Sequence, residues 1–307
     1  MTAKRKRRRN RGSASAATEA AAPEVIEAEE APPERPTRPM MAESPFPPLG
    51  QSLAQGIRVV GSSPPILAVA FLSLLATWGS FAALGVEADP RGLAVLLPVL
   101  PAQVLGDASL AIPRGASGVS SISALAGLAA LRALSYGLLC LLIVAALRDG
   151  KASISDAMRS LPRIALVFAG LYLVQFGLVL AGIQVLSLLL PQVGFLGMVG
   201  GLYFLGFSQI VAAAEGHAPG QAVRRGTRAA RLPGTRHLTL VLAYFLLLVY
   251  SGAIAPFPVF GPSTPAVGVW SYALVFTFVH VSVMATLAYR WLIVRDQVPV
   301  VAPPRKR

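Results

Sequence analysis

Two long stretches of this chain, Ile164 to Ala214 and Leu238 to Tyr289, contain no Asp, Glu, Lys or Arg at all. They are 51 and 52 residues long, and soluble domains do not leave so much sequence without a charge. Each is long enough for two bilayer spans of about 20 residues and the turn between them. Because a spanning segment must satisfy its backbone internally, we expect each stretch to form a membrane-embedded helical hairpin.

Cysteine and the usual motifs of catalysis are also scarce. Cys140 is the single cysteine, which excludes an intramolecular disulfide and a redox motif. The chain contains no phosphate-binding glycine loop, no HExxH motif and no Cys/His metal spacing. Asp89, Asp107, Asp149 and Asp156 are isolated rather than clustered as a magnesium site requires. The sequence therefore predicts no catalytic residue, no cofactor and no metal site, and we expect a protein that is not an enzyme.

The chain is rich in hydrophobic side chains and in positive charge at the ends of apolar runs. Hydrophobic residues make up 54% of the sequence and charged residues only 13%. Of the net charge of +13, seven Lys and Arg fall in the first eleven residues, and most of the others flank apolar runs. This distribution is typical of membrane topology signals, and we predict no nucleic-acid partner.

Composition divides the chain into three regions. Residues 1–52 begin with KRKRRRNR and continue as an Ala- and Pro-rich stretch that holds half of all the acids, so we predict a disordered charged tail. Residues 53–295 form the predicted membrane domain, and residues 296–307 a basic tail. Inside the membrane domain, residues 92–113 contain a proline-broken apolar segment too short for a span. We expect that segment to be either re-entrant or interfacial.

The membrane domain is predicted to contain six spans paired as three hairpins. The loops between the second and third spans and between the fourth and fifth are basic, and so are both termini. The positive-inside rule then places both termini in the cytoplasm of a multi-pass, all-α helical bundle in the cell membrane. The predicted spans are Pro65 to Gly85, Gly127 to Leu147, Ile164 to Leu188, Phe195 to Ala214, Leu238 to Pro256, and Gly268 to Ile293.

A weak internal repeat precedes the hairpins. Three times an apolar residue and an arginine (57–58, 158–159, 223–224) stand shortly before a proline. One interpretation is a short interfacial helix that proline stops before the chain enters the bilayer; the other is an ordinary Arg-rich cytoplasmic loop. In the first interpretation the basic side chains contact the lipid bilayer through anionic headgroups. The predicted headgroup contacts are Arg159, Arg163, Arg224, Arg225, Arg228 and Arg231.

The alternation of basic segments with Gly- and Ala-rich hairpins resembles a known family. The segments that carry the resemblance are SISDAMRSLPRIALVFAGLYLV and EGHAPGQAVRRGTRAARLPGTRHLTLVLAYF. They look like six-helix bacterial membrane families related to the membrane domain attached to some glycerophosphoryl diester phosphodiesterases. The resemblance covers residues 50–295 and implies the fold. The catalytic barrel of that family is absent from this sequence, so hydrolysis is not implied.

A few polar residues lie at predicted membrane depth. His280 falls near the middle of the sixth span and Arg132 near the outer end of the second, and together they form our candidate intramembrane polar site. His280 is either functional or bonded to a neighbouring helix, with Gln175, Gln184 and Gln209 as candidate partners. At the cytoplasmic end of the fourth span, we expect Glu215 to form a salt bridge with the Arg-rich loop.

Two function classes follow from these patterns. The first is a non-enzymatic integral membrane protein of the cell envelope, acting as a scaffold or assembly partner. The second is a transporter or permease component for a lipid or small molecule, favoured by the hairpin repeat and by His280. A glycine pair spaced as GxxxG, Gly197 and Gly201, is consistent with close packing in the bundle, with a membrane protein partner or with a homo-oligomer.

Overall fold

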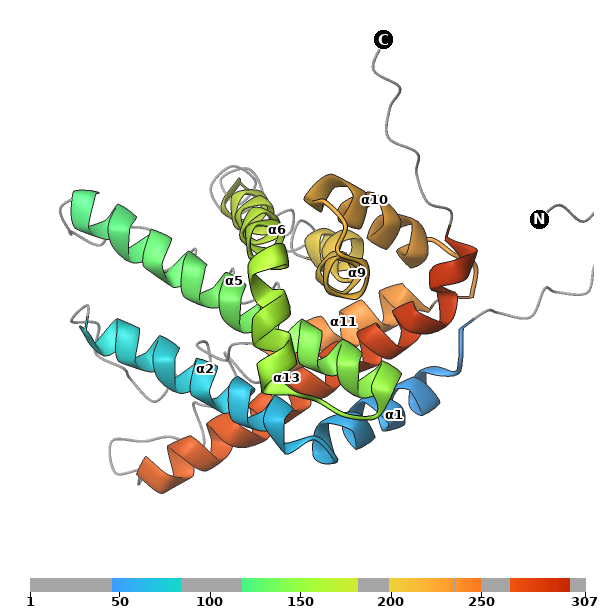
Figure 1. Cartoon of the computed structure of the whole chain (residues 1–307), viewed down its shortest axis with the longest axis horizontal. Helices are drawn as coiled ribbons and strands as arrows, with labels where there is room; N and C mark the ends of the chain where they lie inside the picture. The colour runs from blue at the N-terminus through green and yellow to red at the C-terminus, as the bar shows by residue number, and fades with distance from the viewer. Residues whose placement is uncertain (1–45, 84–117, 182–198, 235, 250–265, 299–307) are drawn as a thin grey trace, which may run out of the picture. The chain divides into compact units, whose positions relative to one another are not determined.

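The structure is a computed structural model that describes residues 46–83, 118–181, 199–234, 236–249 and 266–298 (Figure 1). Within these ranges the regular structure is entirely helical, which confirms the all-α prediction for this part of the chain. The predicted re-entrant or interfacial segment near residues 92–113 lies outside the described residues. So do most of the two predicted tails.

Eight α-helices and one short 3₁₀ helix have described bounds. Residues 199–205 are also helical and lead through a turn into α9. The elements are α1 (Leu49–Gly61), α2 (Pro64–Ala83), α5 (Gly118–Asp149), α6 (Ile154–Ala181), α9 (Ser208–Glu215), α10 (Pro219–Ala230), α11 (His237–Val249), α13 (Ala266–Val294) and η3 (Arg295–Gln297).

Two of the described helices are long and apolar enough to cross a membrane. These segments are Ile154–Val174, within α6, and Trp270–Gln297, which runs from α13 into η3. A third span results if α1 and the start of α2 are counted together as one broken span. Two apolar helices, Val199–Glu215 and His237–Leu247, are shorter. The prediction of six spans in three hairpins is therefore neither confirmed nor contradicted.

The predicted order of basic helix, proline and apolar helix is found at α1 and α2. The two helices meet at a bend of 82°. Ser63 accepts a backbone hydrogen bond from Ile66, and Pro64 and Pro65 occupy the first two positions of α2, where no amide donor is needed. The same order recurs where α10 ends at Ala230, before Pro233 and α11.

The middle copy of the repeat is different, and there the prediction of a proline stop is wrong. Pro162 lies inside α6, which is continuous from Ile154 to Ala181. Proline removes one backbone hydrogen bond from a helix, at a cost of about 3 kcal/mol. Ile164, Phe168 and Leu171 of the same helix are buried in the hydrophobic core between helices. Each such side chain contributes roughly 1.5–3 kcal/mol to the stability of the fold, which offsets this cost.

Helix α13 is the central helix of the described part. It packs against α1, α2, α5 and α9, and α1 lies alongside its C-terminal half (Figure 1). The crossing with α1 is close at Gly56, where an added Cβ atom would lie 2.5 Å from the backbone oxygen of Ser282. Only glycine permits this approach. Because Phe46 and Ser52 are also buried, the folded part begins before residue 52, where the disordered tail was predicted to end.

Candidate functional site

A buried arginine, Arg290, joins the end of α13 to the segment that leads into α1. Its Nη1 atom donates hydrogen bonds of 3.0 Å to the backbone oxygen of Pro47 and 3.1 Å to the hydroxyl of Ser52. Its Cζ atom lies 4.7 Å from the centre of the Phe46 ring. These contacts hold the start of α1 against α13. They also supply acceptors and an aromatic face to the Arg290 guanidinium, whose charge would otherwise be costly to bury.

A second buried arginine, Arg225, joins α10 to the same end of α13. Its Nη2 atom donates hydrogen bonds of 2.9 Å to the backbone oxygens of Arg295 and Val298. Its Cζ atom lies 5.3 Å from the centre of the Trp291 ring. Helix C-termini carry unpaired carbonyls and a partial negative charge, so the guanidinium stabilises the 3₁₀ turn η3 that ends α13.

The acidic partner of Arg225 is Glu215. Nη1 of Arg225 forms an ion pair with Oε2 of Glu215, which confirms the salt bridge expected between Glu215 and the Arg-rich loop. His217 takes part as well, since its Nε2 atom lies 2.7 Å from that carboxylate and 3.1 Å from the guanidinium. The cluster links the end of α9, the start of α10 and the end of α13.

The other arginines of α10 behave differently from Arg225. Arg224, Arg228 and Arg231 are exposed, as the predicted headgroup contacts require. The opposite face of α10, which carries small residues and Arg225, is buried. Gly226 on that face approaches α9 so closely that a Cβ atom would lie 3.0 Å from the backbone nitrogen of Ser208. Arg225 thus contacts protein, while its three neighbours present a basic surface.

The predicted headgroup contacts on α6 are also exposed. Arg159 forms an ion pair of 3.4 Å with Asp156, and both side chains are open to their surroundings. An exposed pair of this kind contributes little to stability, and it leaves the guanidinium able to bind another anion. Arg163 is exposed four residues further along the same helix.

The candidate polar site at predicted membrane depth is centred on His280. The ring is buried, and its Nδ1 atom lies 3.1 Å from the hydroxyl of Tyr244 on α11. Tyr244 is thus a partner of His280, whereas the side chains of two of the glutamines considered from sequence, Gln175 and Gln184, lie outside the described residues. The side chain of Arg132, the other member of the predicted site, lies outside the described residues.

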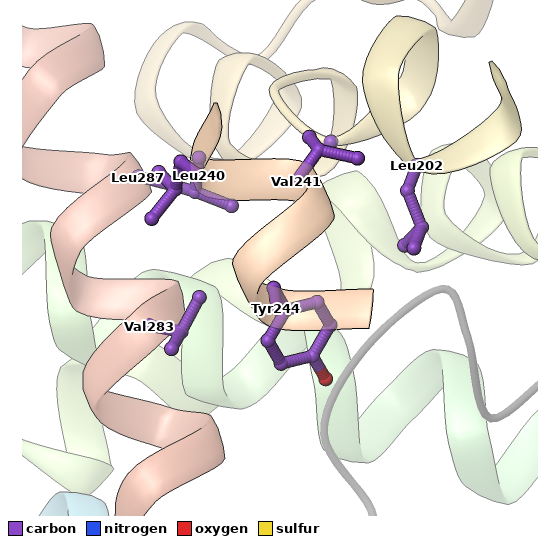
Figure 2. A pocket seen from close by; sticks show the side chains of 7 residues that line it. Leu202, Leu240, Val241, Tyr244, Val283 and Leu287 are labelled. Atoms are coloured by element: carbon purple, nitrogen blue, oxygen red, sulfur yellow. The ribbon is translucent and has the colours of Figure 1, made fainter. Parts of the chain in front are cut away.

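A small cavity borders this polar pair (Figure 2). Its volume is about 20 Å³, room for roughly one water molecule. Figure 2 shows side chains from α11 and α13 facing Leu202 across it. The surface that lines it is apolar, including the part that Tyr244 contributes. The full lining is Leu202, Gly206, Leu240, Val241, Tyr244, Val283 and Leu287.

Sequence reasoning missed the role of the two buried arginines. The signal for Arg225 was present, because Ala222, Gly226 and Ala229 share its helix face and a row of small residues indicates close packing. No equivalent local signal exists for Arg290, whose partners lie more than 200 residues earlier in the chain.

The described residues contain no cluster of three or more His, Cys, Asp or Glu side chains that could hold a metal ion. The chain matches no protein-family model, no curated protein and no solved structure. The resemblance to the membrane domain of glycerophosphoryl diester phosphodiesterases therefore stays a prediction.

Proposed function

We propose that this chain is a non-enzymatic integral membrane protein of the cell envelope that acts as a scaffold or assembly partner. In this proposal the six predicted segments span the cell membrane as three hairpins. The basic ends of the helices and both termini face the cytoplasm. The partners are the bilayer itself, its anionic headgroups, and a second membrane protein or another copy of the chain.

The observation that supports membrane insertion is the exposure of large apolar side chains along the described helices. On α11 they follow one face at Leu238, Leu242 and Leu246, spaced four residues apart. Leu166 on α6 is 85% exposed and Val267 on α13 is 76% exposed. In water each would forgo roughly 1.5–3 kcal/mol of burial, whereas hydrocarbon accommodates them without this cost.

The scaffold role is supported by what the buried ionisable groups do. Arg225, Glu215 and His217 bond to one another and to the end of α13. Arg290 bonds to the start of α1, and His280 pairs with Tyr244. Each of these groups joins two or more helices, so its contacts stabilise the frame. A helical bundle held rigid by such contacts is suited to binding and positioning other proteins.

The alternative is a transporter or permease component for a lipid or small molecule. Its support is the polar pair of Tyr244 and His280 beside a cavity, because ionisable groups at membrane depth often mark transport paths. The cavity holds about 20 Å³, so a path for a substrate would require α11 and α13 to separate. For this reason we place the scaffold role first.

Photo-crosslinking in native membranes tests the proposed function. A photoreactive residue replaces Leu166 on α6 or Val267 on α13, two exposed positions on different helices. A scaffold is expected to give a crosslinked protein of one defined mass from at least one position. The same reagent at buried Leu139 is the matched control and should give no partner. If both exposed positions give lipid adducts alone, the scaffold role is contradicted and the transport alternative is favoured.

A further inference from the structure

Arg231, the residue that follows α10, contacts an aromatic pair that lies next to the start of α11. The Cζ atom of Arg231 lies 5.3 Å from the centre of the Phe204 ring. Phe204 and Tyr203 are 5.0 Å apart between ring centres, and Tyr203 is 5.2 Å from His237, the first residue of α11. A basic helix, an aromatic pair and the first turn of an apolar helix therefore form one continuous surface.

This surface is held in place by polar contacts. The hydroxyl of Tyr203 donates a hydrogen bond of 2.9 Å to the backbone oxygen of Ala230, at the end of α10. His237 Nε2 lies 3.0 Å from the backbone oxygen of Tyr203, and Thr227 bonds to the backbone oxygen of Phe204 at 3.3 Å. The arginines at this end of α10 thus have a fixed position relative to the rings and to α11.

The surface carries positive charge without a matching acid. Arg224, Arg228 and Arg231 are exposed and form no ion pair with the described residues. Glu215, the nearest acid in sequence, is already bonded to Arg225. Guanidinium groups in such a row bind phosphate well, because their planar donors match two phosphate oxygens at once.

An exposed apolar row begins at the same place. Phe204 is 40% exposed, and Leu238 follows directly after His237. The row continues along α11 through Leu242 and Leu246. Leu202 faces Val241 across the small cavity, so the segment that carries Phe204 runs beside α11 (Figure 2).

We propose that this surface, comprising Arg228, Arg231, Phe204 and the row Leu238, Leu242 and Leu246, is a binding site for one anionic glycerophospholipid. The phosphate binds the two arginines, Phe204 packs against Arg231, and an acyl chain follows the leucine row. An acidic protein would match the arginines but would leave the leucine row without a partner. The site rests on the proposed membrane insertion and adds a lipid class and a location to it.

Native mass spectrometry of the full-length protein tests the site. The probes are phosphatidylglycerol and phosphatidylcholine with identical acyl chains, supplied at equal amounts. The wild-type protein is expected to retain one phosphatidylglycerol in preference to phosphatidylcholine. Each surface arginine contributes about 1 kcal/mol at low salt, so Arg228→Gln/Arg231→Gln should lower that preference by about 30-fold.

Two further variants make the result specific. Arg159→Gln/Arg163→Gln removes the same charge from exposed positions on α6 and should keep the preference. Arg228→Lys/Arg231→Lys keeps the charge and should retain part of it. Phosphate in excess should not displace the bound lipid from the wild-type protein, because inorganic phosphate lacks the acyl chain.

Three outcomes would overturn the site. One is an unchanged preference in Arg228→Gln/Arg231→Gln, and another is an equal loss in the α6 control. The third is a co-purifying acidic protein that the double variant loses while its lipid content stays the same. Alkaline carbonate extraction of the membranes separates the two proposals. Protein released by carbonate contradicts membrane insertion, whereas membrane-retained protein without lipid preference contradicts the lipid site alone.

Discussion

Arg290 and Ser52 are joined by a hydrogen bond of 3.1 Å, although 238 residues separate them in the chain. The bond connects α13, the central helix, to α1, the first described helix. Arg225 makes a comparable connection between α10 and the end of α13. The two arginines therefore hold both basic helices, α1 and α10, against one end of α13.

Replacing Arg290 by methionine should release the start of α1. The change leaves the oxygen of Pro47 and the hydroxyl of Ser52 without their donor and removes the contact with Phe46. We expect a loss of about 1–3 kcal/mol in the free energy of unfolding and faster proteolysis within α1. Thermal unfolding and limited proteolysis of the purified protein measure both. Arg58→Gln, at an exposed position on α1, is the control and should change neither.

Gly56→Leu should separate α1 from α13. An added Cβ atom meets the backbone of Ser282 at 2.5 Å and of Thr286 at 2.9 Å, so one helix must move. We expect a loss of about 1–3 kcal/mol, measured as a lower unfolding temperature. Gly61→Ala lies in the same helix with nothing within 4 Å, and it should be neutral or slightly stabilising. Equal effects of the two variants would show that α1 does not pack on α13 as described.

The ion pair between Glu215 and Arg225 should show strong coupling. Arg225→Met leaves a largely buried carboxylate without its guanidinium, which typically costs about 3–5 kcal/mol. Adding Glu215→Gln removes the unpaired charge, so the double variant should be more stable than Arg225→Met alone. Arg224→Met, one residue away and exposed, should stay within about 0.5 kcal/mol of the wild type. Additive effects in a chemical unfolding cycle would contradict direct contact.

Cysteine labelling tests the proposed topology. Cys140 is buried and can be replaced by alanine to give a background without thiols. Cysteines at Lys151 and Gly220, both exposed, should be protected from an impermeant thiol reagent in intact cells. A cysteine at Ser263, before α13, should react. Gly150 is a poorer position because its φ of 70° strains any side chain. The reverse labelling pattern would invert the orientation.

His280→Ala distinguishes packing from transport. Under the scaffold proposal the variant loses the bond to Tyr244 and should lower the unfolding temperature and cellular abundance. Tyr244→Phe should do the same more weakly, by about 1 kcal/mol, because only the hydroxyl is lost. Leu274→Ala, exposed on the same helix as His280, is the control. A lost cellular phenotype at normal abundance would instead favour a functional role for His280.

Local patterns in the sequence predicted the local features of this structure. Apolar stretches predicted the long helices α6 and α13, and prolines at positions 64 and 65 predicted the bend after α1. Arg224, Arg228 and Arg231 were among the predicted headgroup contacts, and all three are exposed. Pro162 misled because tertiary packing can offset one missing hydrogen bond.

Long-range features could not be predicted in the same way. The partner of His280 was sought among glutamines, but the structure brings Tyr244 from a neighbouring helix. A single sequence contains no information on which polar residues of two helices meet. Arg290 is a second example. A basic residue at the end of an apolar helix predicts a cytoplasmic helix end, and this pattern is the same whether or not the side chain is buried.

The bond between Arg290 and Ser52 also bears on how the chain is made. Synthesis proceeds from the N-terminus, so α1 emerges long before the helix that receives it. Until α13 is complete, α1 can contact α2 and α5, but the face that carries Gly56 lacks its main packing partner. A chain truncated before Arg290 therefore leaves an amphipathic helix undocked at its other end. Complete docking of α1 therefore requires that translation has passed α13.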